Sequence, residues 1–194
     1  MLQGLHKNID TADEVPMCVV VDRLTFHIPF QFEFTLNSLF NQNYSNFFVV
    51  LANDGSKLGD ILLRKYLHFY DIPKERYVYL ENKEKQGTMA ITLQAVGIFC
   101  SKDSFVVNLA GNDEFIGRNV LKIFSAVSQQ EDGPLLMYSN SYFHWPGASF
   151  DYGIAGIYSE AEIKDKKFRT DRLKHEYPFF FHSQLLRKVE NENL

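Results

Sequence analysis

The stretch Phe105-Val106-Val107-Asn108-Leu109-Ala110-Gly111-Asn112-Asp113-Glu114 joins an apolar run to a polar turn. The run of residues 104–109 is short, mostly apolar and contains two valines, as expected of a buried strand in a parallel sheet. The Gly, Asn, Asp and Glu residues that follow are typical of the turn that ends such a strand. Ligands of open α/β sheets lie beyond the carboxyl ends of the strands, so this turn is a candidate binding segment.

Strand and helix patterns alternate along the rest of the chain. Strands are predicted at 17–21, 47–52, 76–80, 104–109 and 135–139, and helices at 30–40, 58–70, 88–100 and 119–128. Beyond Gly153 the pattern is weaker, and residues 179–189 have the apolar spacing of a partly buried helix. The alternation predicts an α/β fold with a Rossmann-like, mostly parallel sheet flanked by helices.

The composition indicates a globular domain and excludes several classes of partner. The chain has 194 residues, of which 45% are hydrophobic and 15% aromatic, enough for a substantial core. A net charge of −4 without a local Lys/Arg stripe argues against nucleic acid as a direct partner. No apolar run approaches the roughly 20 residues that span a bilayer, so no transmembrane segment is predicted.

The two cysteines and the first residues bear on the compartment. Cys18 lies in an apolar run and Cys100 ends a predicted helix, without Cys-x-x-Cys spacing. Both are predicted to be reduced packing residues, which favours an intracellular reducing compartment, either the cytoplasm or an organelle interior such as the mitochondrial matrix. Residues 1–16 are polar and mixed in charge, unlike a secretory signal or a transit peptide.

Four segments, in their order and spacing, resemble the opening of the family-2 glycosyltransferases with the GT-A fold. They are Cys18-Val19-Val20-Val21, residues 36–44, Asn53-Asp54-Gly55-Ser56 and residues 105–113. In that family these segments surround a nucleotide sugar and its divalent metal. The resemblance therefore implies a GT-A fold and a nucleotide-sugar transferase ancestry.

The resemblance also implies a domain organisation. A single GT-A-like domain is expected at residues 17–189, with a nucleotide-binding-like half at 17–140 and a truncated acceptor-side half at 141–189. Residues 1–16 would form an N-terminal extension and residues 190–194 a tail.

The resemblance implies a vestigial nucleotide-sugar site. Asp54, Gly87 and Asp113 match positions of the family's donor site, and Asn112 occupies a further position of it. Asp54 and Gly87 also have a structural interpretation, because a strand-to-helix turn and the start of a helix need such residues. Both interpretations stay open at the level of the sequence.

Several positions depart from the family pattern. Asn53 replaces the first Asp of the acidic turn, and Ala110 and Asn112 replace carboxylates of the Asp-x-Asp metal site. Mg²⁺ and Mn²⁺ need oxygen ligands, preferably anionic ones, and alanine has none. Asp113 and Glu114 remain, either as a weak metal site or as acidic residues that face solvent in a turn.

These departures predict a pseudoenzyme, a glycosyltransferase-like protein without catalysis that serves as a structural or interaction subunit of a larger assembly. Other protein subunits are the expected partners, and no cofactor is expected. No catalytic residue is assigned, since the family's acceptor-side base has no clear counterpart in the second half.

Two alternatives remain open. One is an active, inverting glycosyltransferase that binds a nucleotide sugar with Mn²⁺ or Mg²⁺ through Asp113 and Glu114, with Asp54 as a further contact. Its base would come from a late carboxylate such as Asp151 or Glu160. The other is a nucleotide sensor that needs no metal.

Overall fold

The computed structural model describes residues 14–22, 29–56, 59–130, 136–138, 141–143, 151–153, 160–165 and 183–187. These belong to two compact units, Met1–Met137 with Gln184–Leu194, and Tyr138–Ser183. The second unit contains β6 (Ser141–Phe143) and β7 (Asp151–Gly153), which pair antiparallel, and α6 (Glu160–Asp165). The domain bounds expected from the sequence stay a prediction.

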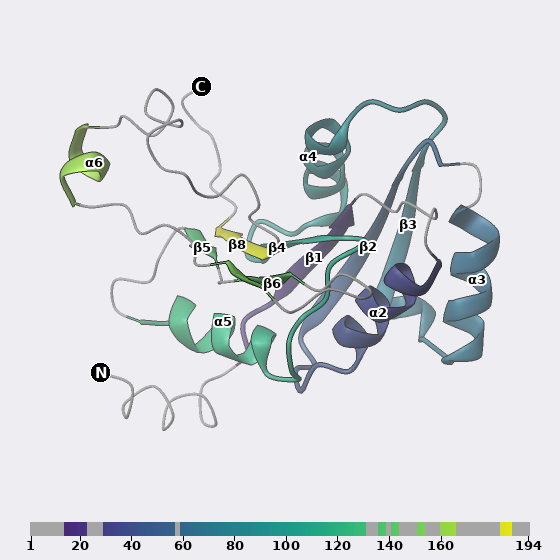
Figure 1. Cartoon of the computed structure of the whole chain (residues 1–194), viewed down its shortest axis with the longest axis horizontal. Coiled ribbons are helices and arrows are strands. Elements are labelled where there is room, and N and C mark those ends of the chain that lie inside the picture. Colours follow the sequence, from purple (N-terminus) through teal and green to yellow (C-terminus); the bar gives the residue numbers. More distant parts are fainter. Residues whose placement is uncertain are drawn as a thin grey trace. The chain divides into compact units, whose positions relative to one another are not determined.

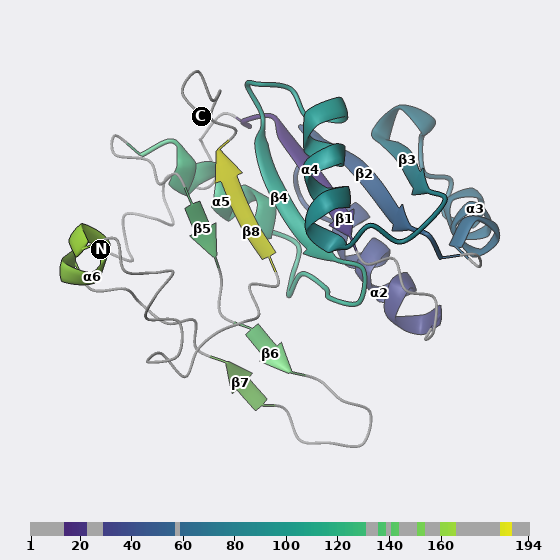
Figure 2. The same ribbon diagram turned by 90° about the horizontal axis from the view of Figure 1, so that it is seen from above.

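The first unit is built on a six-stranded sheet of order β3-β2-β1-β4-β8-β5 (Figures 1 and 2). The strands are β1 (Met17–Asp22), β2 (Phe47–Asp54), β3 (Tyr77–Asn82), β4 (Phe105–Ala110), β5 (Leu136–Tyr138) and β8 (Ser183–Arg187). Strands β1 to β4 pair in parallel. The predicted α/β class with a mostly parallel sheet is confirmed.

Helices cover both faces of this sheet. They are α2 (Pro29–Phe40), α3 (Gly59–Phe69), α4 (Thr88–Phe99) and α5 (Val120–Ser128), with a 3₁₀ turn η1 at Lys74–Arg76. Large buried apolar residues of α2, α3 and α5 share one core cluster, and the buried residues of α4 belong to a second one. Figure 1 accordingly shows α4 on the opposite side of the sheet from α2 and α5.

Alternation along the central strands fills both cores. Val19 and Val21 lie in the cluster beneath α2, α3 and α5, whereas Cys18 and Val20 lie beneath α4. All four side chains are buried. A strand that is covered on both faces needs apolar side chains on both, so residues 17–21 form an unbroken apolar run.

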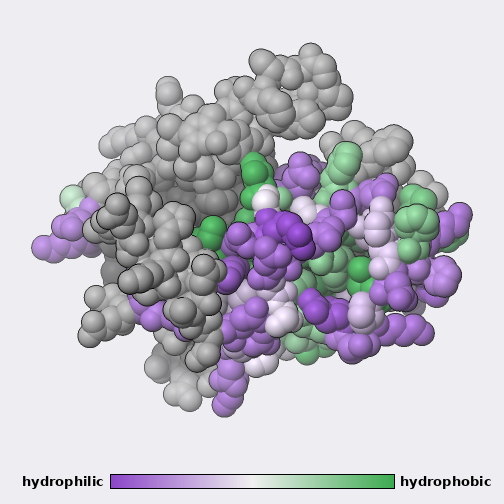
Figure 3. Space-filling model, turned by 90° about the horizontal axis from the view of Figure 1, so that it is seen from below, coloured by the Kyte–Doolittle hydropathy of each residue, from purple (hydrophilic) through white to green (hydrophobic). Residues whose placement is uncertain are grey.

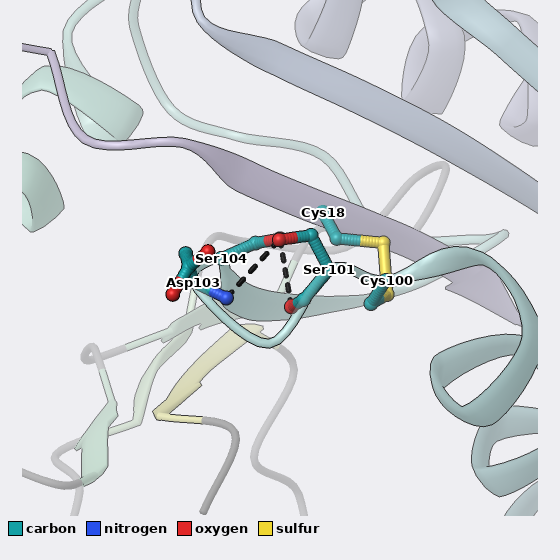
Figure 4. Close-up of a disulfide and its surroundings, with 5 residues drawn as sticks. All are labelled: Cys18, Cys100, Ser101, Asp103 and Ser104. Atoms are coloured by element: carbon teal, nitrogen blue, oxygen red, sulfur yellow. Dashed lines mark hydrogen bonds between the residues drawn. A yellow bond between two sulfur atoms is a disulfide. The ribbon is translucent and has the colours of Figure 1, made fainter.

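The prediction of two reduced thiols is wrong, because Cys18 and Cys100 form a disulfide (Figure 4). It joins the central strand β1 to the residue that ends α4. Beyond it the chain turns tightly, since Ser101 accepts hydrogen bonds from the Asp103 N–H and the Ser104 hydroxyl. Disulfides persist mainly in oxidising compartments, so these cysteines give no support to a reducing interior.

One secondary-structure prediction is also wrong. Residues 183–187, inside the helix expected at 179–189, form strand β8. This strand is inserted between β4 and β5 in the sheet. Pairing with two neighbours outweighs local helical spacing, as it often does for short segments. Residues 179–182 and 188–189 lie outside the described part of the chain.

Within the described ranges, no helix combines the length and the apolar character needed to cross a membrane.

Candidate functional site

Two pairs of neighbouring residues mark the carboxyl edge of the sheet. Asp22 at the end of β1 lies beside Ala110 at the end of β4, and Asp54 at the end of β2 lies beside Asn82 at the end of β3. On each of these strands every second side chain lies on the face that α4 covers, and these four residues continue that series. The edge where ligands of α/β sheets bind therefore carries polar side chains on its α4 face.

The Asp54 carboxylate organises the loop between β3 and α4. Its oxygens accept hydrogen bonds from the Asn82 side chain at 3.0 Å, the Gln86 N–H at 2.9 Å and the Gly87 N–H at 2.6 Å. Burial pushes the pKa of this carboxyl upward, but these bonds and the nearby Lys85 charge outweigh burial and lower the pKa below its ordinary value. The acidic residue that matches the donor site is thus engaged within the chain.

We expect Asp54→Asn to destabilise the chain by about 1 to 2 kcal/mol at pH 7, because a neutral amide is a weaker acceptor than a carboxylate. Since the folded-state pKa of Asp54 is lowered, its contribution is present above the ordinary pKa of 3.8 and is lost as the pH falls through the folded value. Urea unfolding of both proteins between pH 7 and pH 3 measures this difference. A difference that did not shrink in acid would contradict the role of the charge.

Two glycines shape the neighbouring turns. Gly87 precedes α4 with φ of 99°, a backbone conformation that L side chains rarely adopt, although a Cβ there would meet nothing within 4 Å. At Gly55 a Cβ would come within 2.9 Å of the Lys85 backbone nitrogen. The turn after β2 and the loop after β3 are therefore packed against each other.

Asn53 is fully buried and uses its amide as a donor. Its Nδ2 lies 2.8 Å from the Ser56 carbonyl, 2.7 Å from the Tyr79 hydroxyl and 3.2 Å from a carboxylate oxygen of Glu81. Its Oδ1 accepts the Ser56 N–H at 2.9 Å. A carboxylate at this position would have no hydrogen to donate to the Ser56 carbonyl or the Glu81 carboxylate, so an amide fits these surroundings.

The turn after β4 holds the residues predicted as a weak metal site. The Asp113 N–H donates to the Ala110 carbonyl at 2.9 Å, and the Gly111 N–H donates to the Asp22 carbonyl at 2.6 Å. Asn112 and Glu114 are exposed, and Asp113 is half-buried. These three residues lie together on this turn, while the structure joins Asp54 directly to Gly87 in the loop before α4.

The donor set of this turn is a poor fit to a hard divalent cation. Ala110 offers no side-chain oxygen, and Asn112 offers only a neutral one. In the part of the chain that the structure describes, no three His, Cys, Asp or Glu side chains are grouped so that they could hold a metal ion.

Asp22 was not identified as a candidate from the sequence, although it lies at the carboxyl edge of the sheet beside Ala110. Its side chain is 1% exposed, and the Thr92 hydroxyl of α4 donates to its Oδ2 at 3.2 Å. The available signal was an acidic residue that ends an apolar strand. Its position beside Ala110 depends on strand register, which the sequence does not reveal.

The late carboxylates proposed as a base lie in the second unit. Asp151 begins β7, and Glu160 begins α6 and is exposed. Their role as a base stays a prediction.

The mostly parallel sheet and its flanking helices define a Rossmann-like α/β fold. Among solved structures, the chain is similar to the mannosyltransferase PcManGT from Pyrobaculum calidifontis, described in complex with GDP-Man and Mn2+. The likeness has a TM-score of 0.51 at 15% identity and covers 67% of this chain and 40% of that chain. At this identity it shows the fold alone, and this chain spans well under two thirds of its neighbour.

No protein-family profile matches the chain, and no curated protein matches it.

Proposed function

We propose that this chain is a family-2-like glycosyltransferase domain that does not transfer sugar and acts as a structural or interaction subunit with other proteins. The observation that carries the proposal is the engagement of the donor-site positions in internal contacts. The Asp54 carboxylate accepts hydrogen bonds from two N–H groups of the loop before α4, and the Asn53 amide contacts two side chains of β3. The degenerate Asp-x-Asp segment, with Ala110 and Asn112 in place of carboxylates, also supports the proposed loss of sugar transfer.

The chemistry of sugar transfer explains why these losses matter. A nucleoside diphosphate leaving group carries negative charge that a metal ion or a cation must neutralise as the glycosidic bond breaks. Asp113 and Glu114 alone provide few anionic ligands for such a metal. Binding of a nucleotide sugar and transfer of its sugar would both be impaired.

The second candidate function is an active glycosyltransferase that uses a nucleotide sugar with Mn²⁺ or Mg²⁺. It is favoured by the similarity to a mannosyltransferase described with GDP-Man and Mn2+. Asp113, half-buried after β4, is the residue on which this function depends.

Calorimetry separates the two functions. We expect no Mn²⁺-dependent heat when UDP, GDP or their sugars are titrated into the chain, and no hydrolysis or transfer from a panel of nucleotide sugars. Asp113→Ala should therefore behave as the parent chain, as should the control Asp103→Ala, which changes a carboxylate in a turn before β4.

Metal-dependent heat that disappears in Asp113→Ala but persists in Asp103→Ala would overturn the proposal and support the enzyme. Nucleotide binding without metal or turnover would instead indicate a sensor.

A further inference from the structure

The loop between α2 and β2 contains Asn43-Tyr44-Ser45, which has the Asn-x-Ser pattern of an N-glycosylation acceptor. It is the single match to Asn-x-Ser/Thr in the sequence. A short pattern of this kind also arises by chance, and a glycan is bulky, so the asparagine must lie at the surface to carry one. The geometry of the loop therefore decides whether the pattern can act.

Exposure alternates along this loop. Asn43 and Ser45 are exposed, whereas the neighbouring residues Gln42 and Tyr44 are buried. Tyr44 belongs to the core cluster beneath α2, α3 and α5, and its hydroxyl donates to the Val15 carbonyl. The buried residues hold the loop so that the asparagine and the serine of the pattern both face solvent.

The contacts of Asn43 leave room for a substituent on its amide. The Asn43 N–H donates to the Arg118 carbonyl at 2.6 Å, and Nδ2 donates to Asn119 Oδ1 at 2.9 Å in an exposed contact. Nδ2 carries two hydrogens, and N-glycosylation replaces only one of them. One N–H stays available to Asn119, so a glycan is compatible with the folded loop.

The disulfide between Cys18 and Cys100 is a second, independent indication. Disulfides form and persist in oxidising environments such as the lumen of the endoplasmic reticulum. Acceptor asparagines of N-glycans likewise belong to surface loops of secreted proteins. The cross-link and the Asn-x-Ser pattern involve different residues and different chemistry, and they indicate the same compartment.

We propose that Asn43 is an N-glycosylation site. The co-substrate is an oligosaccharide joined to a lipid through a diphosphate, and an oligosaccharyltransferase of the secretory pathway catalyses the transfer. The bond between the sugar C1 and the diphosphate oxygen breaks, and the lipid diphosphate leaves with the electron pair. C1 forms a bond with Nδ2 of Asn43, which loses one proton, so the step needs no oxidant or reductant.

The contacts of Ser45 set the order of modification and folding. In the folded chain its hydroxyl donates to the Glu14 carboxylate, which also accepts the N–H groups of Ser45 and Asn46. The acceptor pattern requires a hydroxyl two residues after the asparagine. Because folding engages that hydroxyl, transfer precedes the docking of Glu14 on this loop.

A glycan on this loop leaves the candidate site open. The loop precedes β2 at the amino edge of the sheet, whereas Asp54 ends this eight-residue strand at the carboxyl edge. At about 3.3 Å per residue the strand separates the two edges by roughly 25 Å. In Figure 1 the loop lies at the lower ends of β1 and β2, and Figure 3 views the molecule from below, with hydrophilic side chains over much of the described part. The proposal therefore stands or falls separately from the proposed loss of sugar transfer.

Mass spectrometry of the full chain, isolated from the cells that make it, tests the proposal. We expect the peptide that contains Asn43 to be heavier by one oligosaccharide, and peptide-N-glycosidase to remove the sugar and leave aspartate. Asn43→Gln and Ser45→Ala should each lose the whole mass increment, whereas Ser45→Thr should keep it, because threonine supplies the same hydroxyl. The control Asn41→Gln changes another exposed asparagine of this loop, outside the pattern, and should also keep the increment.

The peptides are measured after digestion, so a variant that is less stable still gives a result. An unmodified Asn43 peptide in the parent chain would overturn the proposal and leave an ordinary surface asparagine. A mass increment that persists in Asn43→Gln would also overturn it, since the sugar would then be attached to a different residue.

Discussion

Breaking the disulfide between Cys18 and Cys100 is expected to lower the free energy of unfolding by about 4 to 5 kcal/mol. The two cysteines are 82 residues apart, and a cross-link that closes a loop of that length removes much of the entropy of the unfolded chain. The expected loss is a large part of the roughly 5–15 kcal/mol that stabilises a typical domain.

The location of the bond adds a native-state reason for the effect. Both cysteines are buried in the core cluster between the sheet and α4, with Ile91 and Ala95 of the helix. This cluster is smaller than the one on the opposite face, where α2, α3 and α5 pack. Loss of the bond should therefore weaken the attachment of α4, which carries Thr92 and begins directly after Gly87.

Urea unfolding with and without a reductant measures the effect on the unmodified chain. Cys100→Ala and the double variant Cys18→Ala with Cys100→Ala should lose similar amounts, because either change breaks the same bond. Thiol titration of the denatured parent chain under non-reducing conditions should find no free thiol. Two free thiols, or an unfolding curve that a reductant leaves unchanged, would show that the bond makes no contribution.

The sequence could predict the sheet but not this bond. Apolar runs such as residues 17–21 and 47–52 and the helices between them reveal a parallel α/β fold directly. The disulfide depends on the position of α4 over β1, which brings Cys18 to within 5.5 Å of Cys100 between Cα atoms. No local spacing carries that information. Strand β8 was missed for a similar reason, because its neighbours are distant in the sequence.

The candidate site was predictable in its positions and not in its contacts. Asp54 and Gly87 were identified from motif order, and the structure joins them by a hydrogen bond of 2.6 Å. Asp22 and its partner Thr92 were missed, because their contact joins the end of β1 to helix α4, which is distant in the sequence. Residue identity reveals candidates, whereas register and helix placement decide what each candidate contacts.

Asn53→Asp, which introduces the acidic residue found in the family that the sequence resembles, is expected to destabilise the chain by about 3 kcal/mol at pH 7. The amide is fully buried and donates to the Ser56 carbonyl and the Tyr79 hydroxyl. A carboxylate would face the Ser56 oxygen and the Glu81 carboxylate with no hydrogen to donate. Burial and this like charge should raise the pKa of the introduced carboxyl, so the destabilisation should shrink as the pH falls toward 4.

A second substitution separates charge repulsion from the loss of donors. Asn53→Asp combined with Glu81→Gln removes one of the two facing carboxylates and should recover part of the stability. As the control, Glu81→Gln alone should cost less than about 1 kcal/mol, because the Glu81 side chain is exposed.

Equal stability of Asn53→Asp and the parent chain at pH 7 would show that the turn accepts a carboxylate. Asn53 would then be a neutral replacement, and its presence would no longer support loss of the donor site. A large, pH-dependent penalty would instead mean that the contacts of β3 and of the turn after β2 require an amide at this position.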